Sequence, residues 1–172
     1  MIYPLASRLR VIQDAGDRTP NLQRQVIHRL DIADNVATPL FTVSTGGGTP
    51  PLQDGGAYLC RVSALIAHGG TSATTNAATK AFAARFTRAM IGAGTGALSA
   101  VSEDYDDTAA DTDAATRSIG NVTLSVAETS EYVITASITV DLTGTGVDSA
   151  EVVALVEVLW TGFLTTPEIA PA

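Results

Sequence analysis

The segment Tyr132–Leu142 alternates apolar and polar residues without interruption, and this pattern limits the folds that the chain can adopt. The apolar positions are Tyr132, Ile134, Ala136, Ile138, Val140 and Leu142. The positions between them are Val133, Thr135, Ser137, Thr139 and Asp141. A period of two over eleven residues predicts a half-buried β-strand with a Thr/Ser-rich outer face.

The same alternation recurs along the chain. It predicts strands over Val26–Ile32, Leu40–Ser44, Tyr58–Ala67, Val122–Val126 and Glu151–Phe163. In the first of these, one face carries Val26, His28, Leu30 and Ile32. The last is apolar on both faces, so we expect it to be a central strand or to be covered by another chain. We expect the final three strands to form a meander.

The stretch 72–91 fits two structures. Its alanines favour a helix, and Phe82, Phe86 and Met90 lie four residues apart. The same three residues also fit a period of two. In a chain that otherwise reads as strands, we favour a strand from about Lys80, with a helix packed on a sheet as the alternative.

These strands and the turn signals between them predict an all-β fold, an antiparallel β-sandwich that is jelly-roll-like. We expect residues 1–24 to form an extended N-terminal arm and residues 25–172 to form the sandwich domain. Within that domain, the Gly- and Pro-rich residues 45–56 predict a flexible loop.

Charge and composition exclude several classes of protein. The net charge of -8 argues against a nucleic-acid partner, because phosphates require basic side chains. No apolar run has the ~18 residues that a membrane helix needs. The first residues lack the pattern of a secretory signal, and a single cysteine, Cys60, allows no internal disulfide. We therefore expect folding in a reducing cytoplasm, with Cys60 in the core.

Basic charge is concentrated at the start of the chain. Nine of the ten basic residues are arginines, and none follows Arg117, whereas seven acidic residues do. This asymmetry is consistent with docking or self-association, with an ordinary solvated surface as the alternative. The candidate docking residues are Arg8, Arg10, Arg18, Arg24 and Arg29.

Motifs that would indicate cofactor or zinc chemistry are weak. Residues 92–97 match G-x-G-x-x-A, but the sequence that follows does not predict the helix that a dinucleotide site requires. The Gly46–Gly48 run lacks the lysine of a phosphate loop. His28 and His68 do not have zinc-ligand spacing. We expect no cofactor.

The acidic cluster at residues 103–113 is the densest polar feature. Its carboxylates offer oxygen ligands for Ca²⁺, with Asp104, Asp106 and Asp107 as weak candidates, but the EF-hand pattern fails and a solvated loop is the expected structure. Glycoside hydrolysis would need aromatic sugar platforms, which are scarce here. We find no Ser-His-Asp order or nucleophile elbow, and we expect Trp160 to pack in the core. We therefore expect no enzyme activity.

Several segments together have a characteristic composition and strand order: Asp31–Val43, Ala57–Leu65, Ala81–Ala89, Asn121–Val126, Val140–Gly146 and Val156–Trp160. In composition and strand order, these segments resemble virion structural proteins of tailed bacteriophages, in particular small β-sandwich decoration and fibre modules. The resemblance implies a protein made in the host cytoplasm that serves in the virion, with major capsid or other virion proteins as partners. It also implies a homo-oligomer, with a trimer favoured.

On this basis we expect a non-enzymatic structural protein of a phage particle, most simply a capsid decoration (cement) or head-fibre protein. A tail-fibre or receptor- or carbohydrate-binding module, using residues 45–56 or 92–115, is the alternative. A metal-dependent hydrolase built on the acidic cluster is the third hypothesis.

Overall fold

The computed structural model describes residues 21–45, 56–68, 78–90, 96–109, 117–130, 132–144, 149–161 and 167–172. All regular elements in these ranges are strands, and none of these ranges holds a helix that could span a membrane. The strands are β1 (Asn21–Ala33), β2 (Thr38–Ser44), β3 (Ala57–His68), β4 (Ala78–Met90), β5 (Gly96–Leu98), β6 (Ser102–Ala109), β7 (Arg117–Ser130), β8 (Val133–Gly144), β9 (Ser149–Thr161) and β10 (Glu168–Pro171).

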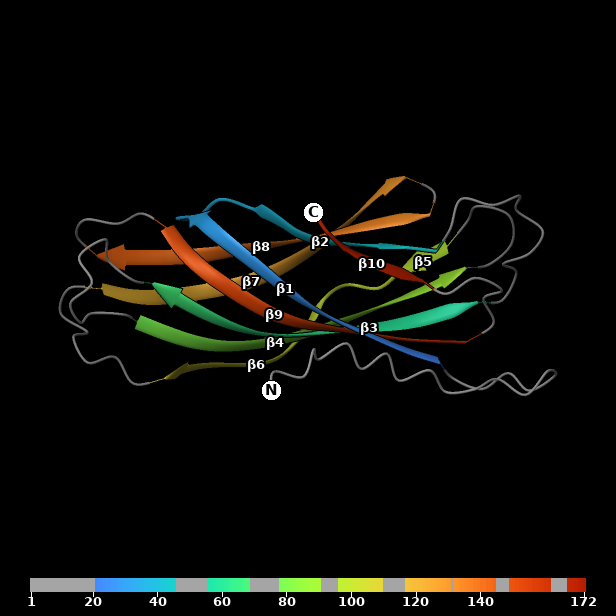
Figure 1. Ribbon diagram of the computed structural model, residues 1–172, viewed down its shortest axis with the longest axis horizontal. Coiled ribbons are helices and arrows are strands. Elements are labelled where there is room, and N and C mark those ends of the chain that lie inside the picture. The colour runs from blue at the N-terminus through green and yellow to red at the C-terminus, as the bar shows by residue number, and fades with distance from the viewer. Residues whose placement is uncertain are drawn as a thin grey trace, which may run out of the picture.

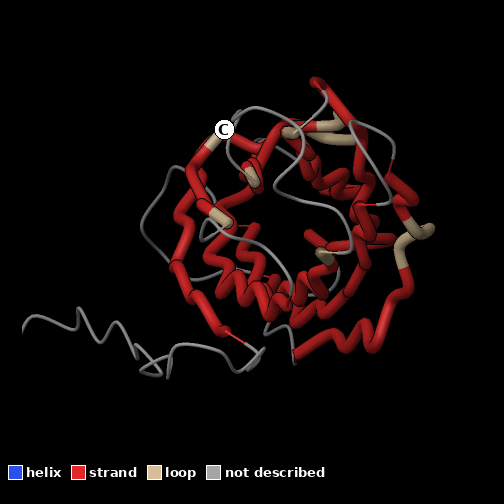
Figure 2. The backbone as a smooth tube through the Cα atoms, turned by 90° about the vertical axis from the view of Figure 1, so that its right-hand side faces the viewer, coloured by secondary structure: helices blue, strands red, loops and turns tan. Residues whose placement is uncertain are grey.

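The strands form two antiparallel sheets that face each other (Figure 1). The large sheet has the order β1-β9-β3-β4-β5, and β6 also pairs with β4. The small sheet has the order β10-β2-β8-β7. Seen at right angles to that view, the two sheets curl around a shared interior (Figure 2). The predicted all-β, antiparallel, sandwich-like class is therefore confirmed.

Both sheets contribute apolar side chains to one continuous core. From the large sheet, Ile27, Val62, Phe82, Phe86 and Val156 are almost fully buried. From the small sheet, Phe41, Val122, Ile138 and Val140 meet them. Because alternate residues of each strand point to the same face, a period of two is sufficient to bury one side of every long strand. Cys60 and Trp160 are buried in this core, as predicted.

Within the ambiguous stretch 72–91, the described residues 78–90 form a strand. β4 begins at Ala78 and pairs with β3 along its whole length, with Phe82 opposite Ala64 and Phe86 opposite Cys60. Tertiary pairing with β3 outweighs the helix propensity of the alanines, because both phenylalanines then enter the core.

The expected facing of the first strand is wrong in part. The core residues of β1 are Ile27 and Ile32, whereas Val26 and Leu30 are exposed. A register shift between Arg29 and Ile32 explains the difference, because the inserted residue moves Ile32 to the inner face. Asp31 lies within this shift with φ 58°, a left-handed conformation that Asp tolerates better than most residues.

The predicted three-strand meander is also wrong. β7 and β8 form a hairpin, but β9 crosses to the large sheet and pairs with β1 and β3. The prediction that this two-sided apolar strand is central is confirmed (Figure 1). Jelly-roll topology is not confirmed, since β3, β4 and β6 are successive neighbours in one sheet. Residues 1–20 of the predicted arm (residues 1–24) and residues 46–55 of the predicted loop lie outside the described residues, whereas residues 21–24 of that arm belong to β1.

Candidate functional site: an apolar outer sheet face

Residues 102–109, which include most of the acidic cluster, form the strand β6 and not the predicted solvated loop. β6 pairs with β4 here, with Asp106 opposite Phe82 and Asp107 opposite Ala81. The Asp104 carboxylate lies 3.2 Å from Arg85 Nε, which neutralises one of the three Ca²⁺ candidates. Within the described ranges, no three His, Cys, Asp or Glu side chains gather as a metal site. Asp111 and Asp113 lie outside those ranges.

The predicted docking arginines divide into two groups. Arg8, Arg10 and Arg18 lie outside the described residues, so their docking role stays a prediction. Arg24 belongs to β1, and its Nε lies 2.5 Å from Glu157 Oε1 on β9. Arg29 Nη1 donates a hydrogen bond of 2.8 Å to the carbonyl of Ala172, which ties β1 to the end of the chain.

The structure also locates the end of the 92–97 motif and both histidines. Gly96 and Ala97 belong to β5, which pairs with β4 and leads into no helix. His28 is exposed on β1, with its Nε2 2.5 Å from Glu151 Oε1, whereas His68 is buried at the end of β3. The structure does not bring the two histidines together, because they lie on opposite faces of the large sheet.

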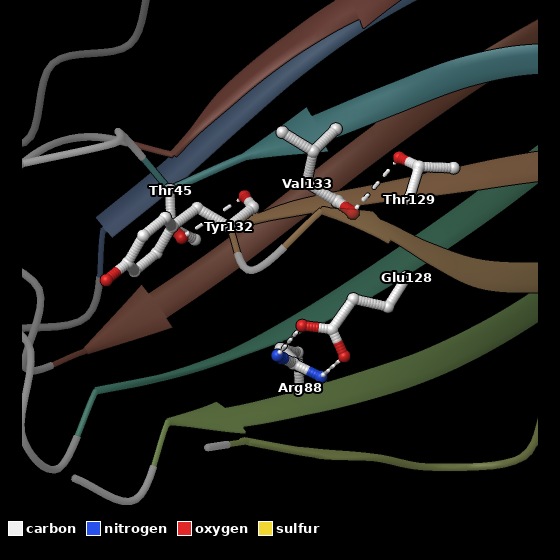
Figure 3. A network of polar contacts seen from close by, with 6 residues as sticks. All are labelled: Thr45, Arg88, Glu128, Thr129, Tyr132 and Val133. Atoms are coloured by element: carbon white, nitrogen blue, oxygen red, sulfur yellow. Dashed lines mark hydrogen bonds and ion pairs between the residues drawn. The ribbon is translucent and has the colours of Figure 1, made fainter. Parts of the chain in front are cut away.

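A charged contact that the sequence did not reveal joins the two sheets. Arg88 on β4 donates from Nη1 to Glu128 Oε2 at 3.0 Å and from Nη2 to Oε1 at 2.6 Å (Figure 3). The Arg88 side chain is 3% exposed, whereas that of Glu128 on β7 is 37% exposed. A bidentate pair of this kind fixes both the spacing and the orientation of the strands that carry it.

Polar groups continue around this end of the sandwich (Figure 3). The backbone N–H of Thr45, at the end of β2, donates to the carbonyl of Tyr132 at 3.0 Å. Thr129 Oγ1 donates to the carbonyl of Val133 at 3.3 Å. On β3, burial raises the pKa of the Tyr58 hydroxyl, whose ring meets Phe86 edge-on. These hydrogen bonds and the Arg88–Glu128 pair hold β2, β4, β7 and β8 together at this end of the molecule.

A second buried cation lies further along β4. Lys80 donates from Nζ to the carbonyl of Gly120 on β7. Burial lowers the pKa of this ammonium, while the charges of Asp141 and Glu103 oppose that shift. Lys80 and Arg88 thus join β4 to β7 at two places eight residues apart.

The most unusual surface is the outer face of the large sheet. Six large apolar side chains there are exposed, and we call this group the apolar face. Its members are Val26, Leu30, Leu65, Val153, Leu155 and Leu159. Val26 and Leu65 are each 64% exposed. β-strand pairing makes the patch contiguous, because Val26 lies opposite Leu155 and Leu65 lies opposite Val153.

Contiguous apolar surface of this kind is typical of a protein–protein contact. A charged row crosses the face, in which Glu157 lies between Arg24 and Arg61 and Arg85 follows Arg61 on β4. The sequence indicated part of this feature through the two-sided apolar character of β9. It did not show that β1 and β3 would lie on either side of β9 and extend the patch.

No protein-family model matches the sequence, and a comparison with curated proteins finds no match. Among solved structures, the chain is similar to the tailspike protein of Acinetobacter baumannii phage AM24, at 13% identity and a TM-score of 0.44. It is also similar to the tailspike protein of Acinetobacter phage vB_ApiP_P1, at 15% identity and a TM-score of 0.36.

The two likenesses cover 90% and 100% of this chain. They cover only 28% and 25% of the tailspike chains, so this chain spans about a quarter of their length. Because both TM-scores lie below 0.5, these likenesses assign neither a function nor a site.

Proposed function

We propose that this chain is a structural module of a bacteriophage particle that acts by assembly rather than by catalysis. The observation that carries the proposal is the apolar face, which leaves large side chains such as Val26 and Leu65 in water unless another protein covers them. The resemblance of the strand segments to phage decoration and fibre modules supplies the biological setting.

Two positions in a particle remain as candidates. The lack of a long fibrous repeat in the sequence favours a capsid decoration or head-fibre protein. The second candidate is a tail-fibre or receptor-binding module, and it agrees with the names of the tailspike proteins reported above. Both positions require contact with other virion proteins. We propose that the apolar face and the predicted N-terminal arm make such contacts.

Immunogold labelling of purified phage particles with an antibody against this chain tests the proposal. We expect gold on the particles, and its place on head or tail distinguishes the two positions. Absence of the chain from purified particles, checked by mass spectrometry of the same sample, would overturn the particle role. Binding of the isolated chain to a host glycan on an array would favour the receptor-binding form.

The predicted arm has a separate test. We expect deletion of residues 1–20 to weaken binding of the purified chain to particles. A variant in which Arg8, Arg10 and Arg18 are all replaced by Lys keeps the charge and serves as the matched control. Undiminished binding by the deletion variant would remove the docking role of the arm but leave the particle role standing.

A further inference from the structure

We propose that the apolar face is a contact between two copies of this chain, packed face to face about a two-fold axis. The axis runs along the strands, between β9 and β3. The proposal deepens the assembly role above by naming the partner of the same face as a second copy. We define a row as a set of residues that lie opposite one another on neighbouring strands of the large sheet. The two-fold rotation brings each row of one copy onto the same row of the other.

The pairing of β9 with β3 defines four rows on the outer face. Leu159 lies opposite Leu59, Glu157 opposite Arg61, Leu155 opposite Ser63 and Val153 opposite Leu65. A two-fold axis along the strands keeps every row in place and exchanges the two strands. Each side chain of β9 then meets the β3 residue of its own row in the second copy.

The charged side chains of the four strands meet in one row under this operation. Glu157 of each copy meets Arg61 of the other, so the contact contains two opposite-charge pairs and no like-charge pair on these strands. In the same row, Arg24 of each copy faces Arg85 of the other. Within its own chain Arg24 is held by Glu157 and Arg85 by Asp104, and these carboxylates reduce the repulsion between the two arginines. The two Glu157–Arg61 pairs at the centre of the contact therefore set its register.

The apolar side chains match as well. Leu159 meets Leu59 of the second copy, and Val153 meets Leu65, so apolar rows pack on apolar rows. The outer strands are complementary in size, because β1 then lies over β4. Val26 and His28 of β1 share rows with the small residues Ala83 and Ala81 of β4. Bulky side chains of one copy therefore face alanines of the other.

The extent of the face is sufficient for a modest dimer. Four strands at about 4.8 Å spacing and nine residues at about 3.4 Å give a face of about 590 Å². Two such faces bury about 1,200 Å² together, which is near the lower limit for a specific interface. The two sheets are expected to cross at about 30°, as aligned sheets do, so the central rows carry most of the contact.

Sedimentation analysis of the purified full chain tests the proposal. We expect a species of twice the 17.7 kDa chain mass that dissociates on dilution. Arg61→Glu and Glu157→Arg each place two like-charge pairs across the axis, and each is expected to weaken the dimer about a hundredfold. Leu65→Ser is expected to weaken it about tenfold, because two leucines lose their buried contacts.

Mixing the two charge variants gives the sharpest readout. In the mixed pair, the negative side chains at positions 61 and 157 of one chain face the positive side chains at 157 and 61 of the other. We therefore expect the mixture to recover a heterodimer, detected with chains of different tag length, although neither variant pairs with itself. Glu168→Arg reverses an exposed charge on β10, away from the face, and should leave the dimer unchanged.

A monomer, or the trimer expected from the sequence, would overturn the two-fold contact, as would charge variants that fail to recover on mixing. A monomer that self-associates only after deletion of residues 1–20 would identify that segment as the occupant of the face. Circular dichroism of each variant shows whether it folds. Because immunogold labelling tests the particle role separately, failure of the dimer and failure of the proposed function are distinguishable.

Discussion

Arg88 and Glu128 form a bidentate ion pair across the two sheets, and the two partners differ sharply in burial. The guanidinium is almost completely removed from water, whereas more than a third of the Glu128 side chain is exposed. The pair therefore depends on the carboxylate to compensate a cation that water cannot reach. This asymmetry gives a direct prediction.

Glu128→Ala should destabilise the protein more than Arg88→Met. The first change removes the carboxylate that forms a bidentate pair with a buried cation, and it is expected to cost about 3 kcal/mol. The second leaves a carboxylate that water can solvate and replaces the guanidinium with an apolar side chain, at about 1 kcal/mol. Urea unfolding of both variants measures the two costs. Equal costs, or the reverse order, would contradict the burial argument.

Burial of Cys60 makes the free energy of unfolding depend on pH in the alkaline range. Burial raises the pKa of its thiol above the ordinary value of about 9. The unfolded chain therefore loses this proton first, and stability that is complete below about pH 9 falls as the pH rises. Tyr58 acts in the same direction above about pH 10.

We expect the free energy of unfolding to decrease between pH 8.5 and 10, with a limiting slope of about 1.4 kcal/mol per pH unit for one proton. Cys60→Val keeps an apolar side chain of similar size and should reduce the slope. Because the lowered pKa of Lys80 acts in the opposite direction below pH 10.5, the comparison uses the variant rather than the wild type alone. An unchanged slope in Cys60→Val would refute the prediction.

Gly120 is a packing position on β7. A Cβ placed there would lie 2.3 Å from Asp141 Oδ2 and 2.9 Å from its Cγ. Gly120→Ala must therefore displace the Asp141 side chain, with an expected cost of about 1–3 kcal/mol. In the double variant with Asp141→Ala the clash is relieved, so the combined cost should fall short of the sum by about 1 kcal/mol. Additive costs would show that the two positions do not interact.

Asp34 orders the crossing from β1 to β2. Its Oδ1 accepts hydrogen bonds from the Leu142 backbone at 2.7 Å and from Asn35 Nδ2 at 2.9 Å. Asp34→Ala leaves the partly buried Leu142 N–H without this acceptor and should cost about 1–3 kcal/mol. Asp34→Asn keeps an acceptor oxygen and should recover most of the loss. Amide hydrogen exchange at Leu142 should accelerate in the first variant and remain slow in the second.

Period-two alternation was sufficient to locate most of the long strands. It worked for β3 and β8 because one face of each is uniformly buried in the core. It failed for β1, where a register shift near Asp31 exchanged the faces. It also failed for β6, whose acidic residues are typical of a solvated loop although its backbone pairs with β4. Three- and four-residue strands such as β5 and β10 are too short to show a period.

The features that define the candidate site depend on contacts between distant residues. Arg88 and Glu128 are forty positions apart, and no local pattern links them. The apolar face needs β1 and β3 on either side of β9, and the sequence does not specify that order. What could be read was the two-sided apolar character of β9, which correctly indicated a central strand and which we have interpreted as a covered one.

The central place of β9 also bears on how the chain is made. β1 and β3 each find a hydrogen-bonding partner in β9, which is synthesised about a hundred residues later. During translation, β1 cannot pair with β9 until nearly the whole chain has been synthesised. Contacts between such distant residues slow folding, and the waiting strands are open to wrong pairings. Synthesis in the cell therefore exposes this protein to aggregation at a stage when its first strands are complete but unpartnered.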